Sequence, residues 1–343
     1  MKAINRKLLR DLWQMKSQVV TIALVVAAGM AGFIGSISTY DSLQTLLNAY
    51  YDEAHFGQVF AELKRAPKAE EQQIARIPGV ADAETTVSFD VTLDIPEVNQ
   101  PVIGRLIGLT YATQPRLNQV FIRRGRMIEA GRVGEVVITE AFAKARKLEP
   151  GANLAAVLNG RRQTFNIVGI GLSPEYVYGT AGGVFPGDSG FGVLWIDRAQ
   201  LAATYNMEGA FNRVAIRLSP GASERAVIDA LDRTLEPYGG LRAYGRDDQI
   251  SNKIISQEIS QQKVMGTTLP IPFFAVAAFL LNVVLARIVA TQREQIAALK
   301  ALGYGNADTS GLRGNLRVLI APADQAALLL NTNLMGNHPF PGT

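Results

Sequence analysis

The chain has 343 residues, of which 48% are apolar and 19% charged, so it is too hydrophobic for a disordered protein and long enough for one large or two average domains. Its net charge of +4 is modest and no long basic run occurs, which argues against nucleic acid as a partner. The absence of cysteine excludes disulfides and thiolate sites, and two histidines leave little material for imidazole chemistry. Acidic residues are scattered, so we expect no metal and no cofactor.

Residues 1–18 have the pattern of an amphipathic helix. The apolar face comprises Ile4, Leu8, Leu12 and Met15, and the opposite face comprises Arg6, Lys7, Arg10 and Gln14. We expect this helix to lie on the cytoplasmic surface of an anionic leaflet. A plain basic flank that only orients the following segment is the alternative interpretation.

Residues 19–38 carry no charge over a length that matches the hydrocarbon core of a bilayer, so they predict a transmembrane helix. Small residues recur in it at four-residue spacing, at Ala28, Gly32 and Ser36, and we expect this face to let another helix pack closely. A cleaved signal peptide is the alternative, but the apolar run is longer than such peptides have.

Residues 39–268 predict an α+β extracytoplasmic domain on helical stalks. Leu43, Leu47 and Tyr50 continue the helical periodicity of the first span to about residue 56, and a matching helix over about 248–268 leads into the second span. Further helices are predicted at 67–77, at 139–147 after the apolar run 136–138, and at 198–205 and 223–235. Strands are predicted at 87–95, 105–109, 193–196 and 213–218, a hairpin turn at Asn159-Gly160, and a glycine-rich loop at 179–192.

Residues 269–288 predict a second transmembrane helix, uncharged until Arg287, with Pro270 and Pro272 where a helix start tolerates the missing N–H. Five basic residues precede the first span, and three more, Arg287, Arg293 and Lys300, end or follow the second, whereas acidic residues come first after residue 38. The positive-inside rule therefore predicts a multi-pass membrane protein with both outer ends cytoplasmic and residues 39–268 on the outer side.

Two short motifs resemble catalytic sites without the context that catalysis needs. Gly187-Asp188-Ser189-Gly190 matches the nucleophile segment of trypsin-like proteases, but His55 falls in the predicted stalk and His338 in the tail, so no base is expected near Ser189. Ser260-Gln261-Gln262-Lys263 matches an SxxK pair without its partner motifs, and no phosphate-binding loop occurs. The chain is therefore expected not to be an enzyme.

Residues 289–308 predict a short amphipathic helix that leaves the membrane and ends at a glycine cap. A helix of this kind could insert into a groove of another protein. The run from Gln292 to Tyr304, QREQIAALKALGY, resembles the RxxEIxxLKALG stretch after the second span of FtsX-like ABC-transporter permeases, the group that contains MacB, LolC and LolE. By this resemblance, the residues that contact a separate ATPase would be Arg293, Glu294, Ile296, Leu299, Lys300, Leu302 and Gly303.

The predicted outer domain carries an ordered series of motifs similar to those of the same family. The series comprises Ile77-Pro78-Gly79-Val80 (IPGV), Gly125-Arg126 (GR), Gly134 to Ile138 (GEVVI), Leu148-Glu149-Pro150-Gly151 (LxPGD without its Asp) and Phe165 to Ile170 (FxVVGI). The resemblance implies a MacB-like periplasmic core domain made of two subdomains, one inserted in the other, in a protein of a bacterial inner membrane.

The resemblance also implies a mechanism and partners. Closure of a cytoplasmic ABC ATPase would be transmitted through the stalks to the periplasmic domain, without a substrate channel between the spans. The permease would work with a second permease copy or paralogue, in a lipid bilayer, and with a periplasmic adaptor or lipoprotein.

The resemblance stops near Asp308. Family members have at least two further spans, whereas residues 309–343 form an atypical tail without a long apolar run, so we expect a truncated or frame-shifted product. The alternative function is a membrane receptor with an extracytoplasmic sensor domain between two spans. A receptor, however, should continue after residue 288 into a signalling coiled coil or kinase.

Overall fold

The computed structural model of the protein describes residue 13 and residues 16–95, 102–109, 115–129, 132–178 and 187–301. Most of the predicted helix over 1–18, as well as Leu302, Gly303 and the tail, lies outside these residues. The chain divides into two units, Met1–Asp41 with Ser260–Thr343, and Ser42–Ile259. The two units are described separately below.

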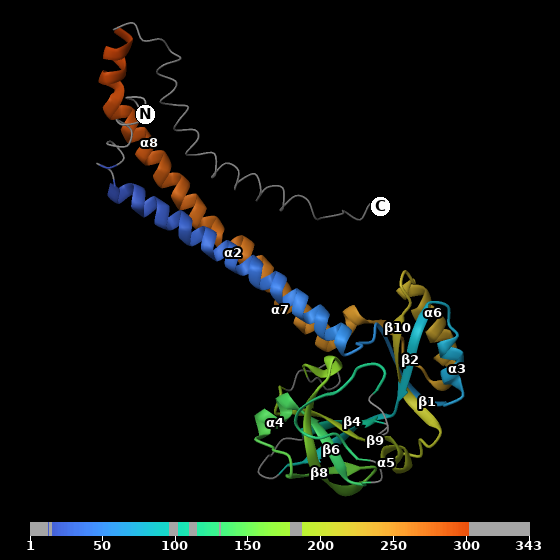
Figure 1. Ribbon diagram of the computed structural model, residues 1–343. Helices are drawn as coiled ribbons and strands as arrows, with labels where there is room; N and C mark the ends of the chain where they lie inside the picture. Colours follow the sequence, from blue (N-terminus) through green and yellow to red (C-terminus); the bar gives the residue numbers. More distant parts are fainter. Residues whose placement is uncertain are drawn as a thin grey trace. The chain divides into compact units, whose positions relative to one another are not determined.

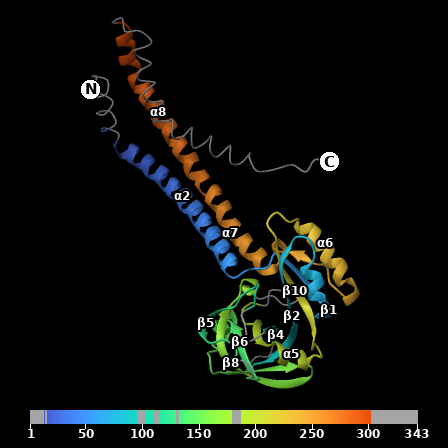
Figure 2. The ribbon, with the colours of Figure 1, turned by 45° about the vertical axis from the view of Figure 1, so that its right-hand side comes forward.

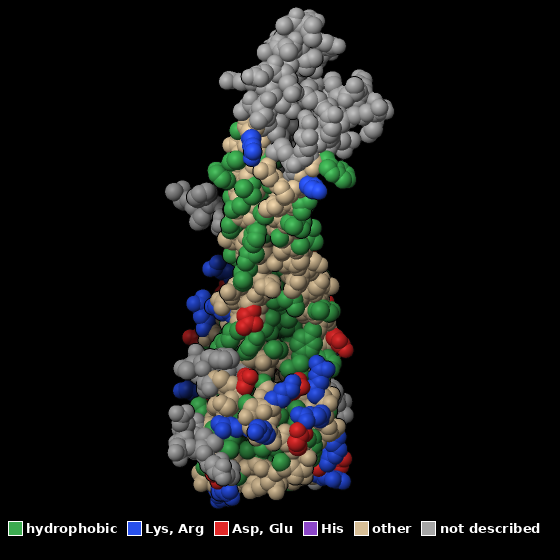
Figure 3. All heavy atoms as spheres, turned by 90° about the vertical axis from the view of Figure 1, so that its left-hand side faces the viewer, with side chains coloured by type: hydrophobic (Ala, Val, Ile, Leu, Met, Phe, Trp, Pro, Cys, Tyr) green, Lys and Arg blue, Asp and Glu red, His purple; other side chains and the backbone are tan. Residues whose placement is uncertain are grey.

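Three long helices carry the apolar segments of the chain (Figure 1). Helix α2 runs from Lys16 to Glu53, α7 from Ile250 to Thr268, and α8 from Pro270 to Ala301. Within them, Lys16–Glu53 and Ile250–Val284 are long and apolar enough to cross a membrane, and only 6% and 17% of their most apolar windows are buried. A core helix of a soluble protein would be mostly buried. Figure 3 shows hydrophobic side chains along these helices, with few charged ones among them.

Four antiparallel strands form the first sheet of the second unit, in the order β11 (Tyr244–Gly245), β1 (Val59–Pro67), β10 (Ala210–Leu218) and β2 (Val80–Thr86). Helices α3 (Glu70–Ala75) and α6 (Glu224–Leu235) cover one face of it (Figure 1). Helix α6 forms there because Val227, Leu231 and Leu235 bury one stripe and the Ser223 side chain caps its first turn.

The chain between β2 and β10 forms a seven-stranded sheet in the order β5-β8-β6-β9-β4-β3-β7. Because β7 also pairs with β8, six of these strands close into a ring, which we call the barrel (Figure 2). Its strands are β3 (Ser88–Asp94), β4 (Val102–Leu109), β6 (Glu135–Thr139), β7 (Asn153–Leu158), β8 (Arg161–Leu172) and β9 (Phe191–Asp197), and β5 (Phe121–Gly125) is added at β8. Helices α4 (Glu140–Arg146) and α5 (Arg198–Thr204) follow β6 and β9.

Most elements of this unit agree with the sequence prediction. The predicted hairpin turn joins β7 to β8, with φ of 48° at Asn159 and 78° at Gly160, as a tight two-residue turn requires. The predicted loop over 179–192 is wrong at its end, because Phe191 and Gly192 begin β9, and residues 179–186 lie outside the described residues. Strands β1, β2, β5 and β11 were not predicted.

Two of the family-like motifs meet in one clamp at the end of the barrel. Arg126 of the GR motif donates to both oxygens of Glu135 in the GEVVI motif, at 2.5 and 2.9 Å, and the Glu135 side chain is 8% exposed. A Cβ atom at Gly169 would lie 2.2 Å from the Arg126 carbonyl oxygen, so only glycine fits there. The GR, GEVVI and FxVVGI motifs are therefore in direct contact at this place.

Candidate functional site at the foot of the helices

The C-terminal end of α2, which we call the foot of α2, is followed by a cluster of aromatic side chains that leads into β1. Tyr51, Phe56 and Phe60 are buried, with ring centroids 4.6 Å apart for the first pair and 5.6 Å for the second. Arg246 caps this turn, since its guanidinium donates to the carbonyls of Phe56 and Gly57 and lies over the rings of Tyr51 and Phe56. The end of the helix is therefore held at a fixed position in the second unit.

The first turn of α7, which we call the foot of α7, is hydrogen-bonded to Tyr51 and Arg246 of the same cluster. The Tyr51 hydroxyl donates to the Asn252 side chain over 3.0 Å, and Asn252 in turn donates to the Arg246 carbonyl. Ser251 and Asn252 are 1% and 5% exposed, so these bonds are shielded from water. Further along α7, Glu258 accepts a hydrogen bond of 2.7 Å from the Tyr178 hydroxyl.

A short segment at 115–119 connects the end of α2 to both sheets. Asn118, with a left-handed φ of 55°, accepts a hydrogen bond from the Gly57 amide at 2.8 Å and donates one to Glu175 at 3.0 Å. Its own amide donates to the His55 carbonyl. The neighbouring Leu117 amide donates to Glu84 on β2 at 2.7 Å. Asn118 therefore joins the foot of α2 to the barrel.

Glu175, in the short 3-10 turn Pro174–Tyr176 after β8, is the barrel residue on which these connections converge. Its carboxylate accepts from Asn118 and from Arg213 on β10 of the four-stranded sheet. Its carbonyl accepts from the Gln249 side chain, one residue before α7, at 2.7 Å. One 6%-exposed residue is thus bonded to Asn118, which holds the chain just after α2, to Gln249 just before α7, and to the other sheet.

Asn118, Glu175, Gln249 and Arg213 meet in a region that we call the junction, and the charged groups there stabilise one another. Burial by itself lowers the pKa of the Arg213 guanidinium, but Glu175, Tyr176 and Glu62 together outweigh it, so that pKa lies well above its ordinary value. Burial raises the pKa of the Tyr51 hydroxyl to about 12 and that of Tyr244 likewise to about 12. Arg213 is therefore a permanent buried cation whose partner is Glu175.

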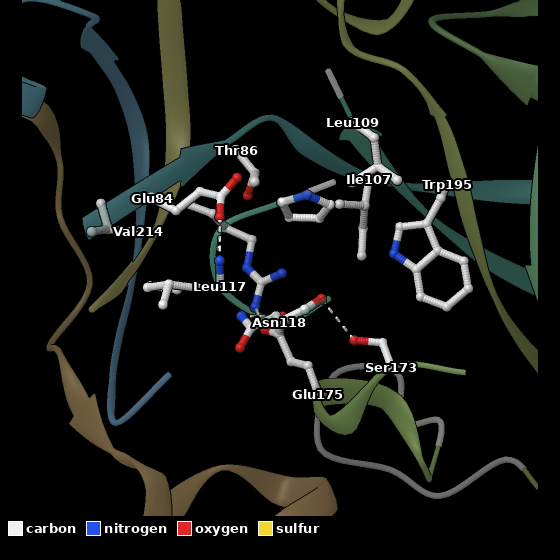
Figure 4. Close-up of a pocket in the computed structure, with 13 residues that line it drawn as sticks. Glu84, Thr86, Ile107, Leu109, Leu117, Asn118, Ser173, Glu175, Trp195 and Val214 are labelled. Carbon is white, nitrogen blue, oxygen red and sulfur yellow. Dashed lines mark hydrogen bonds and ion pairs between the residues drawn. The ribbon is translucent and has the colours of Figure 1, made fainter. Parts of the chain in front are cut away.

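A narrow cleft separates the four-stranded sheet from the barrel at this junction. Figure 4 shows Glu84, Thr86 and Val214 on one side of it and Ile107, Leu109 and Trp195 on the other. The space that water could occupy is about 30 Å³, far below the few hundred Å³ of a small-molecule site. Among the described residues, no three His, Asp or Glu side chains are grouped to hold a metal.

The predicted ATPase-contacting residues lie at the end of α8. The helix continues without interruption through Ala301, so Arg293, Glu294, Ile296, Leu299 and Lys300 are helical, whereas Leu302 and Gly303 lie outside the described residues. The placement of these side chains is not described, and their role stays a prediction.

The predicted packing residues of the first span differ in their surroundings within the first unit. A Cβ atom added at Gly266 of α7 would lie 2.5 Å from the Cβ of Ser36, whereas one at Gly32 would have no heavy atom within 4 Å, and Ala28 is exposed. The buried small residue of α2 is Gly29, where an added Cβ would lie 3.1 Å from that of Phe273. A helix that packs on the whole predicted face stays a prediction.

The protease-like motif forms a turn before β9. Ser189 accepts a hydrogen bond on its carbonyl oxygen from Arg146, and the Gly190 amide donates to the Gly187 carbonyl. The His55 ring contacts the Gln119 side chain at the foot of α2, at 3.0 Å. The contacts of Ser189 and His55 therefore do not assemble a catalytic pair.

Comparisons with known proteins agree with the pattern of motifs. Residues 19–234 match the family described as MacB-like periplasmic core domain. No curated protein matches the chain. Several solved structures match parts of it. The extracellular domain of the noncanonic ABC-type transporter YknZ from Gram-positive bacteria is 12% identical, with a TM-score of 0.36, and the match covers 55% of this chain and 98% of that one.

Two further matching structures come from named bacteria. The periplasmic region of MacB from Actinobacillus actinomycetemcomitans is 11% identical with a TM-score of 0.35, covering 61% of this chain and 95% of that one. A domain of a putative permease from Porphyromonas gingivalis is 15% identical with a TM-score of 0.33, covering 54% of this chain and 81% of that one.

Proposed function

The chain belongs to the family of MacB-like periplasmic core domains, and we propose that it is a permease subunit whose outer domain is moved by a separate ABC ATPase. The observation that carries the proposal is the convergence of both helix feet on Glu175. The family is that of ABC-transporter permease components, which are generally non-catalytic, and ATP hydrolysis is assigned here to the partner.

The proposed topology follows the charge pattern. Residues 1–18 lie at the cytoplasmic surface of the inner membrane, 19–38 and 269–288 cross it, and 39–268 are periplasmic, with stalks at about 39–56 and 248–268. The four-stranded sheet and the barrel are the two subdomains, and the barrel is the inserted one. The second permease copy and a periplasmic adaptor or lipoprotein are further proposed partners.

Three features support transmission of movement from the helices to the barrel. Helix α2 is one uninterrupted element from Lys16 to Glu53, so a displacement at one end reaches the other. Its foot and that of α7 are joined by the Tyr51–Asn252 bond. Both feet then act on the barrel through Asn118 and Gln249. The Asn118 bond to the Glu175 carboxylate contributes about 1.5–3 kcal/mol, and the Gln249 bond to the Glu175 carbonyl contributes about 0.5–1.5 kcal/mol.

On the cytoplasmic side, residues 289–308 are proposed to dock on the ATPase. The test is co-purification of the cognate ATPase with the chain and with the double variant Arg293→Glu/Lys300→Glu, in the same membranes. We expect the double variant to lose the ATPase. The matched control is Arg225→Glu, an exposed charge on α6, which should retain it. Full retention of the ATPase by Arg293→Glu/Lys300→Glu would overturn the docking proposal.

A further inference from the structure

The four-stranded sheet and the barrel have separate apolar cores. The core of the sheet contains Val59, Ile74, Phe211 and Leu231, and those of the barrel contain Phe142, Phe165, Leu194 and, on the outer side of its strands, Trp195. No core cluster among the described residues takes several side chains from each. An interface without a shared apolar core allows relative motion by default.

The chain passes between the two parts twice, from β2 to β3 and from α5 back to β10, and the two crossings lie next to each other. Between β2 and β3, the Ser88 amide donates to the Asn212 side chain at 2.8 Å, and Asn212 donates back to the Ser88 carbonyl at 2.7 Å. Arg198, at the start of α5, donates to the Thr85 carbonyl at 2.7 Å. These bonds hold the end of β2, the start of β3, α5 and β10 close together at the two crossings.

Beyond the crossings, the two parts are joined by a row of alternating charges, which we call the charge ladder. Its members in order are Asp90, Arg105, Glu62, Arg213 and Glu175. Asp90, Arg105 and Glu175 belong to the barrel, whereas Glu62 and Arg213 belong to the four-stranded sheet. The ladder therefore crosses the interface twice, at Arg105–Glu62 over 3.8 Å and at Arg213–Glu175.

The Asp90 end of the ladder is exposed and the Glu175 end is buried. The Asp90 and Glu62 side chains are 42% and 38% exposed, Arg105 is 21% exposed, and Arg213 and Glu175 are 10% and 7% exposed. Exposed pairs of this kind contribute little, whereas a buried cation left without its partner is strongly unfavourable. The Arg213–Glu175 pair is therefore the contact of the ladder whose loss should cost most.

We propose that the charge ladder is a latch that holds the four-stranded sheet against the barrel, and that its release lets the two parts swing apart at the Ser88–Asn212 crossing and opens the cleft lined by Trp195. This inference goes beyond the proposed function, since it concerns motion inside the outer domain and does not involve the ATPase. It links to that function at Glu175, which is both the barrel end of the ladder and the contact of the helix feet.

Trp195 reports on the cleft directly. It is 2% exposed, lines the cleft, and is one of two tryptophans in the chain, the other being Trp13. The experiment measures acrylamide quenching of Trp195 fluorescence in the full chain in bilayer discs, in a Trp13→Phe background. Glu175→Gln removes the charge but nearly keeps the shape, and should shift the ratio of open to closed cleft by about a hundredfold. Acrylamide should therefore quench the Trp195 fluorescence of Glu175→Gln more strongly than that of the parent chain.

Matched variants separate the latch from general damage. Arg162→Gln removes an exposed pair with Asp94, which spans 2.7 Å and joins β8 and β3 within the barrel, and should leave quenching unchanged. Glu62→Gln removes the half-exposed centre of the ladder and should give a smaller increase than Glu175→Gln. Near-ultraviolet circular dichroism and a cooperative thermal transition establish that each variant is folded.

The outcomes decide the proposal. Increased quenching in folded Glu175→Gln and Glu62→Gln, but not in Arg162→Gln, supports the latch. If Glu175→Gln fails to fold, Glu62→Gln decides alone. Quenching equal to that of the parent chain in every folded ladder variant overturns the latch, and it leaves the docking of the ATPase at residues 289–308 untouched. Equal increases in the ladder variants and in Arg162→Gln also overturn it.

Discussion

The apolar helices and the junction at their feet use opposite kinds of side chain. Along the helices, Leu24, Ile34 and Phe279 are 60–67% exposed, as suits a surface that faces lipid. At the junction, Ser251, Glu175 and Arg213 are buried although all are polar or charged. The first region tolerates any apolar side chain of similar size, whereas the second depends on particular partners. Substitutions should therefore act very differently in the two regions.

The largest effect is expected from Glu175→Ala, which leaves the Arg213 cation buried without its partner. We expect a loss of about 3–5 kcal/mol in the free energy of unfolding, because the desolvated charge is no longer compensated. Asp94→Ala, which removes an exposed carboxylate from an ion pair inside the barrel, should cost about 0–1 kcal/mol. Denaturant unfolding of the two variants checks the difference, and equal losses would contradict the role given to the junction.

Asn118→Ala is expected to cost roughly 2–3 kcal/mol, since it removes the bonds to Gly57 and Glu175 and leaves a left-handed backbone at a non-glycine residue. Asn118→Gly loses the same bonds but tolerates the backbone, so it should lie between Asn118→Ala and the parent. The thermal unfolding temperatures of the parent, Asn118→Gly and Asn118→Ala check this order of stability. A Gly variant as stable as the parent would mean that the side-chain bonds contribute nothing.

Within the helices, effects of about 1 kcal/mol or less are expected. Gly35→Ala meets no heavy atom within 4 Å and gains helix propensity, so it should stabilise slightly. Gly29→Ala gains the same propensity but places its Cβ 3.1 Å from Phe273, which offsets the gain. The difference in thermal stability between these two variants in bilayers measures how closely α2 and α8 pack.

The smallest expected effects are changes in stability with pH. The carboxylates of Glu84 and Glu135 should change the stability in opposite directions. Burial raises the pKa of Glu84, so its ionised form opposes folding and its contribution becomes more favourable as the pH falls through that raised pKa. The hydrogen bond from Arg126 lowers the pKa of Glu135, so its contribution is present above the unfolded pKa and is lost as the pH falls through the folded pKa.

Glutamine variants separate these two contributions. At neutral pH, Glu84→Gln should be more stable than the parent and Glu135→Gln less stable. The two stability differences should both shrink as the solution is acidified, which chemical unfolding at a series of pH values measures. Differences that do not change with pH would show that charge is not the cause.

The sequence predicted the regions in which residue type alone decides the structure. Uncharged runs marked the apolar helices, and the Asn159-Gly160 pair marked the hairpin because the tight turn requires positive φ. Strand β2, with the sequence VADAETT, was missed because only Thr85 in it is buried, so it has no apolar alternation. Strand β5, FIRRG, was missed because two arginines follow its short apolar start.

The junction could not be predicted from local pattern. Asn118 bonds to Gly57 across 61 positions, and Arg213 pairs with Glu175 across 38. Each is a single polar residue in an unremarkable context, and its role depends on partners that only the folded chain brings near. A buried arginine in the middle of β10, between the apolar residues Phe211 and Val214, was the one available signal.

The most direct test of the central claim follows the barrel during ATP turnover. The chain lacks cysteine, so a single cysteine at the exposed Val157 of β7 can carry a donor dye, with an acceptor lipid in the bilayer and the cognate ATPase bound. We predict that ATP changes energy transfer in the parent chain and that Asn118→Ala abolishes most of this change while retaining the ATPase. A full ATP response in folded Asn118→Ala would contradict transmission through the junction.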